Sequence, residues 1–225
     1  MRSSTRSASP ARSPSFYIHG VEEDPDVDVH AVVGDFRCQL SSVPQVGRQL
    51  WAFLGGTIGN LVPNERVRLL SAFREQLCPG DHLLVGTDLV KVADRLVAAY
   101  DDAARVTAAF NRNVLTVINR ELHATFDPQL FDHRATWNAE RAWVEMRLRS
   151  RVAHTVTIGD LDLDVAFAEG EEILTEISAK FTPHQIADEL ASANLVTCAM
   201  WQDNGGDFQL TLAGPQPSAA SSPTL

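Results

Sequence analysis

Positive charge, cysteine and long apolar runs are all scarce in this chain. Its 225 residues hold 19 Lys and Arg against 29 Asp and Glu, a formal net charge of −10. That balance argues against a nucleic-acid or anionic-membrane partner. The three cysteines lack the spacing of metal ligands, which favours a reduced, cytoplasmic protein without a metal centre. With no transmembrane run and no signal-peptide pattern, we expect a soluble protein with a small-molecule ligand.

The two ends of the chain have little that could pack into a core. Residues 1–15 are almost only Ser, Arg, Pro and Ala, without an acidic side chain. Transit peptides, solvated tails and misassigned gene starts share this composition. We expect a disordered leader over residues 1–20 and a disordered tail over residues 215–225.

Between these ends, the first half of the chain alternates strand and helix. Strands are predicted at 29–36, 49–55 and 82–89, and helices at 64–77, 92–100 and 105–121. This alternation is typical of an α/β protein with a parallel, doubly wound sheet.

In the second half, apolar residues recur with a period of two. That period predicts half-solvated antiparallel strands near 144–149 and 161–167. Thr182 then caps a predicted helix over 183–193, and a closing hairpin follows at 196–212. The expected domains are a core at 21–90, an α+β insert at 91–180, and a returning helix and hairpin of the core at 181–214.

A glycine-rich turn follows the second predicted strand and ends in an amide side chain. Gly55, Gly56 and Gly59 let the backbone approach a ligand, and Asn60 can both donate and accept hydrogen bonds. Ligands of open α/β sheets bind at such carboxyl ends of strands. Asp35 and Phe36 end the preceding predicted strand and could bind and stack on a nucleoside, although a surface turn carboxylate is the commoner alternative.

Glu176 and Ser178 form a second candidate pair. In an extended segment they share one face, and together they suit a polar ring with two nitrogens, such as imidazole. The alternative is a solvated acidic strand. Tyr100 is one of only two tyrosines and is favoured as ligand-facing, whereas core packing is the default for Phe110 and Met146.

Several segments together resemble a known family, the S-adenosylmethionine-dependent, histidine-specific Nα-methyltransferases of ergothioneine biosynthesis. The matching motifs include VVGDF, FLGGTIGNL, GDHLLVGTDLVK, WVEMRLRSR, GEEILTEISAKF and GDFQLTLA, in the family's order from about residue 29 to 213. The resemblance implies a partial Rossmann-like (class I) methyltransferase sheet with an inserted substrate-binding subdomain. It also implies an enzyme that transfers methyl groups from S-adenosylmethionine to the α-amine of L-histidine, giving trimethylhistidine.

The resemblance also implies residue roles. Asp35 and Phe36 would flank the adenine of the methyl donor. The substrate pocket would consist of Gly55 as lining, Asn60 and Tyr100 at the amino-acid end, Phe110 and Met146 as walls, and Glu176 and Ser178 on the imidazole. No residue would act as a covalent catalyst, because the sulfonium already activates the methyl group.

One departure from the family keeps other interpretations open. The sequence before Asp35 contains no G-x-G turn, the element that cradles the methionine end of the donor in this family. The chain could instead be a non-catalytic histidine-binding or subunit-interaction module, or the product of a misassigned gene start. The sequence indicates no oligomeric state.

Overall fold

The computed structural model describes residue 32 and residues 34–216. The chain divides into two compact units, which meet in sequence between Gln45 and Val46. The described part of the first unit consists of turns and one 3-10 helix, η1 (Leu40–Ser42). The backbone N–H groups of Cys38 and Gln39 both donate to the carbonyl of Asp35. The chain therefore already turns at Asp35, inside the strand predicted at 29–36. For the described residues of that range, the prediction of a strand is wrong.

The predicted leader at 1–20 and residues 217–225 of the predicted tail lie outside the described residues. In the described part of the second unit, four α-helices accompany the strands: α1 (Pro63–Gln76), α2 (Ala93–Tyr100), α3 (Val106–Leu122) and α4 (Pro183–Ser192). All four were predicted within a few residues of these bounds. No helix in the described residues has the length and apolar character needed to cross a membrane.

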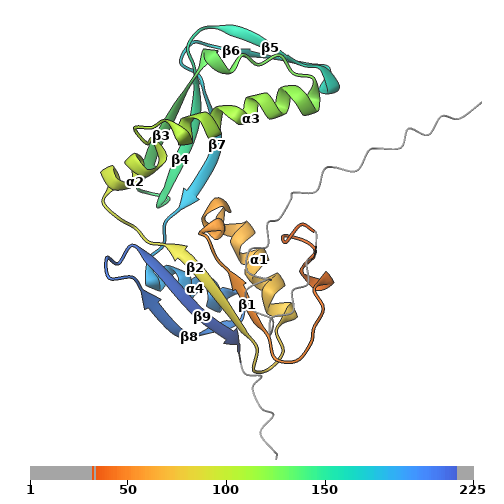
Figure 1. The fold of residues 1–225 in the computed structure, drawn as a ribbon, viewed down its shortest axis with the longest axis vertical. Helices are drawn as coiled ribbons and strands as arrows, with labels where there is room; N and C mark the ends of the chain where they lie inside the picture. The colour runs from red at the N-terminus through yellow and green to blue at the C-terminus, as the bar shows by residue number, and fades with distance from the viewer. Residues whose placement is uncertain (1–31, 33, 217–225) are drawn as a thin grey trace, which may run out of the picture. The chain divides into compact units, whose positions relative to one another are not determined.

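The second unit contains a four-stranded sheet in the order β1-β2-β9-β8, counted over the described residues. β1 (Leu50–Phe53) is parallel to β2 (His82–Asp88), and β9 (Phe208–Pro215) is antiparallel to β2 and to β8 (Leu195–Gln202). Figure 1 shows these four strands side by side. The predicted α/β class and closing hairpin are confirmed. The sheet is mixed and not wholly parallel, because strands joined by a tight hairpin must run in opposite directions.

Helices α1 and α4 pack together against one face of this sheet. The ring of Phe73 in α1 lies 5.8 Å from the ring of Trp51 and 5.6 Å from that of Phe53, both in β1. The ladder partners of these two residues, Leu83 and Val85 in β2, are fully buried. Strand β1 itself alternates between exposed and half-buried residues. The prediction of a buried strand is therefore wrong here, because among the described residues β1 has a neighbour on one side only.

A second sheet has the order β3-β4-β7 and carries most of the candidate residues. Its strands are β3 (Phe131–Asn138), β4 (Trp143–Ser150) and β7 (Glu172–Ala179), all antiparallel. Helix α3 and the hairpin of β5 (His154–Ile158) and β6 (Leu163–Phe167) lie against it (Figure 1). The shared core contains Leu115, Phe126, Phe131, Leu148, Val156 and Phe167. The antiparallel strands predicted from the period of two are confirmed, but β4 is not half-solvated. It lies between β3 and β7, and most of its residues are buried.

The chain crosses between the two sheets twice, once just after β2 and once just after β7, and these two crossings run beside each other. Leu89, just after β2, forms a parallel bridge with Phe181, just after β7. The N–H of Phe181 donates to the carbonyl of Asp88 at 2.9 Å, and the N–H of Val90 donates to the carbonyl of Phe181 at 3.0 Å. This pairing brings the end of β2 next to the end of β7. The domain boundaries predicted at 90 and 180 fall at these crossings but remain a prediction, since residues from 46 onward form one compact unit.

Candidate functional site

A cavity of about 390 Å³ opens where the ends of β1, β2, α2 and β7 meet. Its volume is within the usual range of small-molecule sites, roughly 300–1,000 Å³. The lining residues are Gly55, Gly56, Thr57, Asn60, Asp88, Tyr100, Glu176, Ser178, Lys180 and Phe208. Five of the seven residues that the sequence places in a substrate pocket are therefore brought together from three separate segments.

The glycine-rich turn forms the wall at the carboxyl end of β1. Gly55 and Gly56 have φ angles of 79° and 72°, in the left-handed region that favours glycine. The chain then enters the 3-10 helix η2 (Thr57–Asn60), and Pro63 begins α1 directly afterwards. This sequence of turn, 3-10 helix and α-helix brings the amide of Asn60 to the cavity wall.

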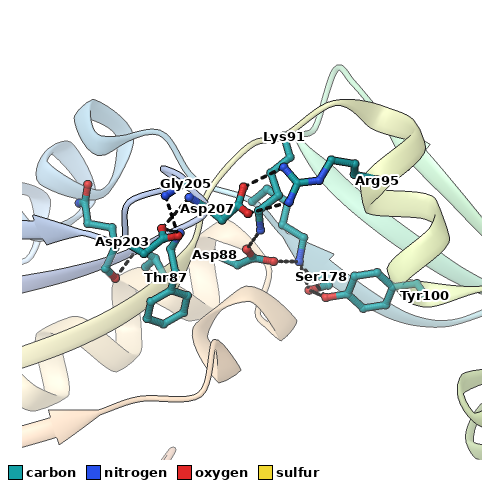
Figure 2. Close-up of polar contacts among 12 residues, drawn as sticks. Thr87, Asp88, Lys91, Arg95, Tyr100, Ser178, Asp203, Gly205 and Asp207 are labelled. Carbon is teal, nitrogen blue, oxygen red and sulfur yellow. Dashed lines mark hydrogen bonds and ion pairs between the residues drawn. The ribbon is translucent and has the colours of Figure 1, made fainter. Parts of the chain in front are cut away.

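Tyr100 and Ser178 meet in the cavity through their hydroxyl groups. Tyr100 Oη and Ser178 Oγ lie 2.7 Å apart, and Figure 2 shows the two side chains pointing toward each other near Asp88. Lys180 Nζ donates to both oxygens at 2.8 Å and forms an ion pair with Asp88 Oδ2 at 2.8 Å. Asp88 also pairs with Lys91 through its other oxygen. The charge of the buried lysine is thus balanced within the protein.

Glu176 is the lining acid without a salt-bridge or hydrogen-bond partner in the described part of the chain. Burial raises the pKa of its carboxyl above the ordinary value. It also lines a second cavity of about 330 Å³, together with Phe110, Val114 and Val117 of α3. Because its neighbours do not satisfy it, the Glu176 carboxylate can accept N–H groups from a ligand.

The two remaining pocket residues lie beside the cavity without lining it. Met146 is buried in β4 directly opposite Glu176, so its side chain shares the face of Glu176. Phe110 lies in the second cavity and is 67% exposed, so the default of core packing is wrong for this residue. Their roles as walls of the substrate pocket remain predictions.

Asp35 and Phe36, the two predicted donor-binding residues, belong to the first unit. The guanidinium of Arg37 binds the Asp35 carboxylate at 2.9 Å and, with the Arg37 N–H, lowers the pKa of Asp35. Both residues line a cavity of about 100 Å³ with Leu40 and Val43. This volume is well below the size of a usual ligand site. This cavity alone is therefore too small to hold the donor.

Sequence reasoning placed Gly56 in the glycine-rich turn without a pocket role, and it missed the other four lining residues: Thr57, Asp88, Lys180 and Phe208. Lys180 could have been found, because it follows Ser178 by two residues and an extended chain keeps such residues on one face. Asp88 ends a predicted strand, which is where ligands of α/β sheets bind. Phe208 carried no comparable signal, since its place depends on the return of β9 to the sheet.

We expect Gly59→Ala to displace the Asn60 wall of the cavity. A Cβ at this position would lie 2.9 Å from the carbonyl oxygen of Ala179, so η2 would have to move away from β7. Overpacking of this kind costs about 1–3 kcal/mol of stability. The variant should also bind a cavity ligand more weakly, as measured by denaturation and by calorimetric titration. Gly170→Ala is the control: it strains a turn residue with a φ of 82° and should leave ligand binding unchanged.

We expect Glu176→Gln to change how stability depends on pH. The pKa of this carboxyl is raised in the folded state. Its contribution to the free energy of unfolding is therefore fully present below the unfolded-state pKa and is lost as pH rises through the folded-state pKa. The amide does not ionise, so the variant should be more stable near neutral pH, by up to about 1 kcal/mol for a half-buried group. The gain should vanish at acidic pH in denaturation curves. An equal gain in stability at neutral and at acidic pH would contradict the raised pKa of Glu176.

The mixed sheet defines an α/β protein, and its polar cavity lies at the carboxyl ends of β1 and β2, where ligands of such sheets usually bind. A family model described as "Histidine-specific methyltransferase, SAM-dependent" matches residues 18–215, and the chain belongs to this family. The predicted family membership is thereby confirmed.

Similar proteins include two mycobacterial relatives. The histidine N-alpha-methyltransferase of Mycolicibacterium smegmatis is 55% identical over 191 residues, 85% of this chain and 60% of that protein. The protein of the same name from Mycobacterium tuberculosis is 53% identical and covers 83% of this chain and 58% of its own length. The chain thus spans about 60% of the length of these relatives. Among solved structures, a similar one is the crystal structure of an S-adenosylmethionine-dependent methyltransferase from Clostridium acetobutylicum, with a TM-score of 0.40 and 10% sequence identity. The match covers 82% of this chain and 64% of that chain.

Proposed function

We propose that this chain carries the L-histidine site of an S-adenosylmethionine-dependent histidine Nα-methyltransferase. The reaction is transfer of methyl groups to the α-amine of L-histidine, giving trimethylhistidine (hercynine) in the ergothioneine pathway. The observation that carries the proposal is the cavity that unites Gly55, Asn60, Tyr100, Glu176 and Ser178. Family membership adds the methyl donor and the reaction class.

The chemistry of the cavity suits a zwitterionic amino acid with an imidazole ring. Glu176 and Ser178 project from one face of β7 and offer hydrogen-bonding oxygens to the two ring nitrogens. Tyr100 and Asn60 offer donors to the amino-acid end. A ligand without ring nitrogens would leave the Glu176 carboxylate unsatisfied, which costs binding energy and selects histidine.

The residues of the chain contribute alignment in this proposal. The α-amine must be neutral to attack a methyl carbon, and polar partners such as Asn60 and Tyr100 orient its lone pair. S-adenosylmethionine, the second substrate, supplies the activated methyl group when it is bound. Because the chain spans about 60% of the length of its relatives, the donor roles of Asp35 and Phe36 and the methyl transfer are proposed for the complete protein.

Separate titrations of the purified chain with L-histidine and with S-adenosylmethionine test the proposal. Binding of both ligands supports a methyltransferase. Binding of histidine alone favours the second candidate, a histidine-binding module, which the small cavity around Asp35 also favours. If L-histidine fails to bind, the assignment of the cavity is overturned. Alanine in place of Asn60 should weaken histidine in these titrations without affecting the fold, because Asn60 is exposed.

We place the protein in the cytoplasm. All three cysteines, Cys38, Cys78 and Cys198, are free and exposed, as is usual for proteins of reducing compartments.

A further inference from the structure

Lys180 is a buried cation at the cavity that neither the sequence motifs nor the proposed function assigns. Only 1% of its surface is exposed. Its Nζ contacts Tyr100 Oη, Ser178 Oγ and Asp88 Oδ2, each at 2.8 Å, and lies 4.7 Å from the centre of the Tyr100 ring. An ammonium group has three N–H donors and no acceptor. All three donors are therefore used within the protein, and Lys180 has none left for a ligand.

The hydrogens of the two hydroxyl groups can be counted from these contacts. Tyr100 and Ser178 carry one O–H each, and the 2.7 Å contact between their oxygens uses one of the two. Because Lys180 can only donate, it cannot accept the other hydrogen. Exactly one hydroxyl hydrogen is thus left to point into the cavity, from Tyr100 or from Ser178 but never from both.

We propose that Lys180 is a positioning residue that makes Tyr100 and Ser178 present one donor and one acceptor to the substrate. The inference rests on the proposed histidine site. When the substrate carboxylate accepts the hydrogen of Tyr100, Ser178 must donate to Tyr100. The remaining lone pair of Ser178 then accepts an N–H from the imidazole. A ring nitrogen without a proton could not form a hydrogen bond here, because Ser178 has no hydrogen left to donate.

Asp88 supports this arrangement through its position at the end of β2. It takes up the third N–H of Lys180 and balances its charge, so the cation does not need a ligand carboxylate as a partner. Asp88 also binds Lys91, whose ammonium contacts neither hydroxyl in the described residues. Lys91 therefore offers a matched control, since its removal takes a cation from the same carboxylate and leaves the hydroxyl pair intact.

The test compares the chain with its Lys180→Met and Lys91→Met variants. Nitrogen NMR of bound ¹⁵N-imidazole-labelled L-histidine reports which ring nitrogen carries a proton. In the unchanged chain and in Lys91→Met, the nitrogen at Ser178 should be protonated. In Lys180→Met the ammonium no longer bridges the two oxygens and holds them in contact, so the Tyr100–Ser178 hydrogen bond can open and both hydroxyls can donate to the ligand. The nitrogen at Ser178 should then lose its proton preference, and affinity for L-histidine should fall about tenfold.

A second ligand separates positioning from a general structural role. The amino acid 3-(2-thienyl)alanine has a ring of similar size without an N–H. The ratio of the L-histidine affinity to the thienylalanine affinity should fall at least about threefold in Lys180→Met. Parallel weakening of both ligands, with an unchanged ratio, would overturn the inference.

The remaining outcomes are also decisive. The double variant Lys180→Met/Asp88→Asn removes the cation together with its counter-charge and keeps the test valid where the single variant folds poorly. Binding of L-histidine with the same ring protonation in every variant would overturn the role of Lys180 and leave the proposed function standing. Failure of the unchanged chain to bind L-histidine would overturn both.

Discussion

Replacing Glu176 by alanine is expected to weaken L-histidine binding by about 1–3 kcal/mol, the cost of leaving a buried polar group of the ligand without its partner. The carboxylate faces the cavity and has no competing partner in the described residues, so a ligand N–H gains its full hydrogen bond. Binding of S-adenosylmethionine by the complete protein should change far less. Calorimetric titration with each ligand separately measures the two effects.

The size of this effect can be separated from a simple loss of negative charge. Glu169→Ala removes an exposed acid from the turn before β7, outside the cavity lining, and should leave histidine affinity unchanged. If Glu176→Ala weakened the donor and L-histidine equally, the imidazole-binding role would be lost. A loss of comparable size in Glu169→Ala would indicate a long-range charge effect.

Alanine at Glu189 is expected to destabilise the folded protein by about 3–5 kcal/mol, because it leaves a buried guanidinium unpaired. Glu189 in α4 binds Arg66 in α1 through two hydrogen bonds, of 2.8 Å and 2.7 Å. The side chains are 3% exposed for Arg66 and 14% exposed for Glu189. The guanidinium also donates to the carbonyl of Leu61 at 2.8 Å and lies over the Phe181 ring, so it cannot move out to water without breaking other contacts.

Equilibrium unfolding in urea, followed by circular dichroism, measures this loss. The matched control is Glu121→Ala, which removes the ion pair between Glu121 and Arg120. The side chain of Arg120 is 70% exposed and that of Glu121 is 60% exposed. Exposed pairs contribute about 0–1 kcal/mol. Similar losses for the two variants would contradict the buried character of the Arg66–Glu189 pair.

Local patterns in the sequence predicted the elements that depend on near neighbours. The helix starting at Pro63, the helix capped by Thr182 and the hairpin at the C-terminal side follow from capping and turn residues, which act over a few positions. The side chains of Glu176 and Ser178 share a face for an equally local reason, the alternation of an extended chain. The strand predicted at 29–36 is wrong for its described residues, because an apolar run alone does not decide between strand and turn.

The sequence by itself determined which side chains could bind an imidazole and an amino-acid end, because residue chemistry and strand period are properties of the local chain. Only the tertiary structure decided that Asp88 and Lys180, 92 positions apart, meet beside Tyr100. That contact depends on the parallel pairing of two chain crossings at Leu89 and Phe181, which no local pattern encodes. Burial likewise depends on distant neighbours, which is why Phe110 lies exposed on α3 while Lys180 is enclosed.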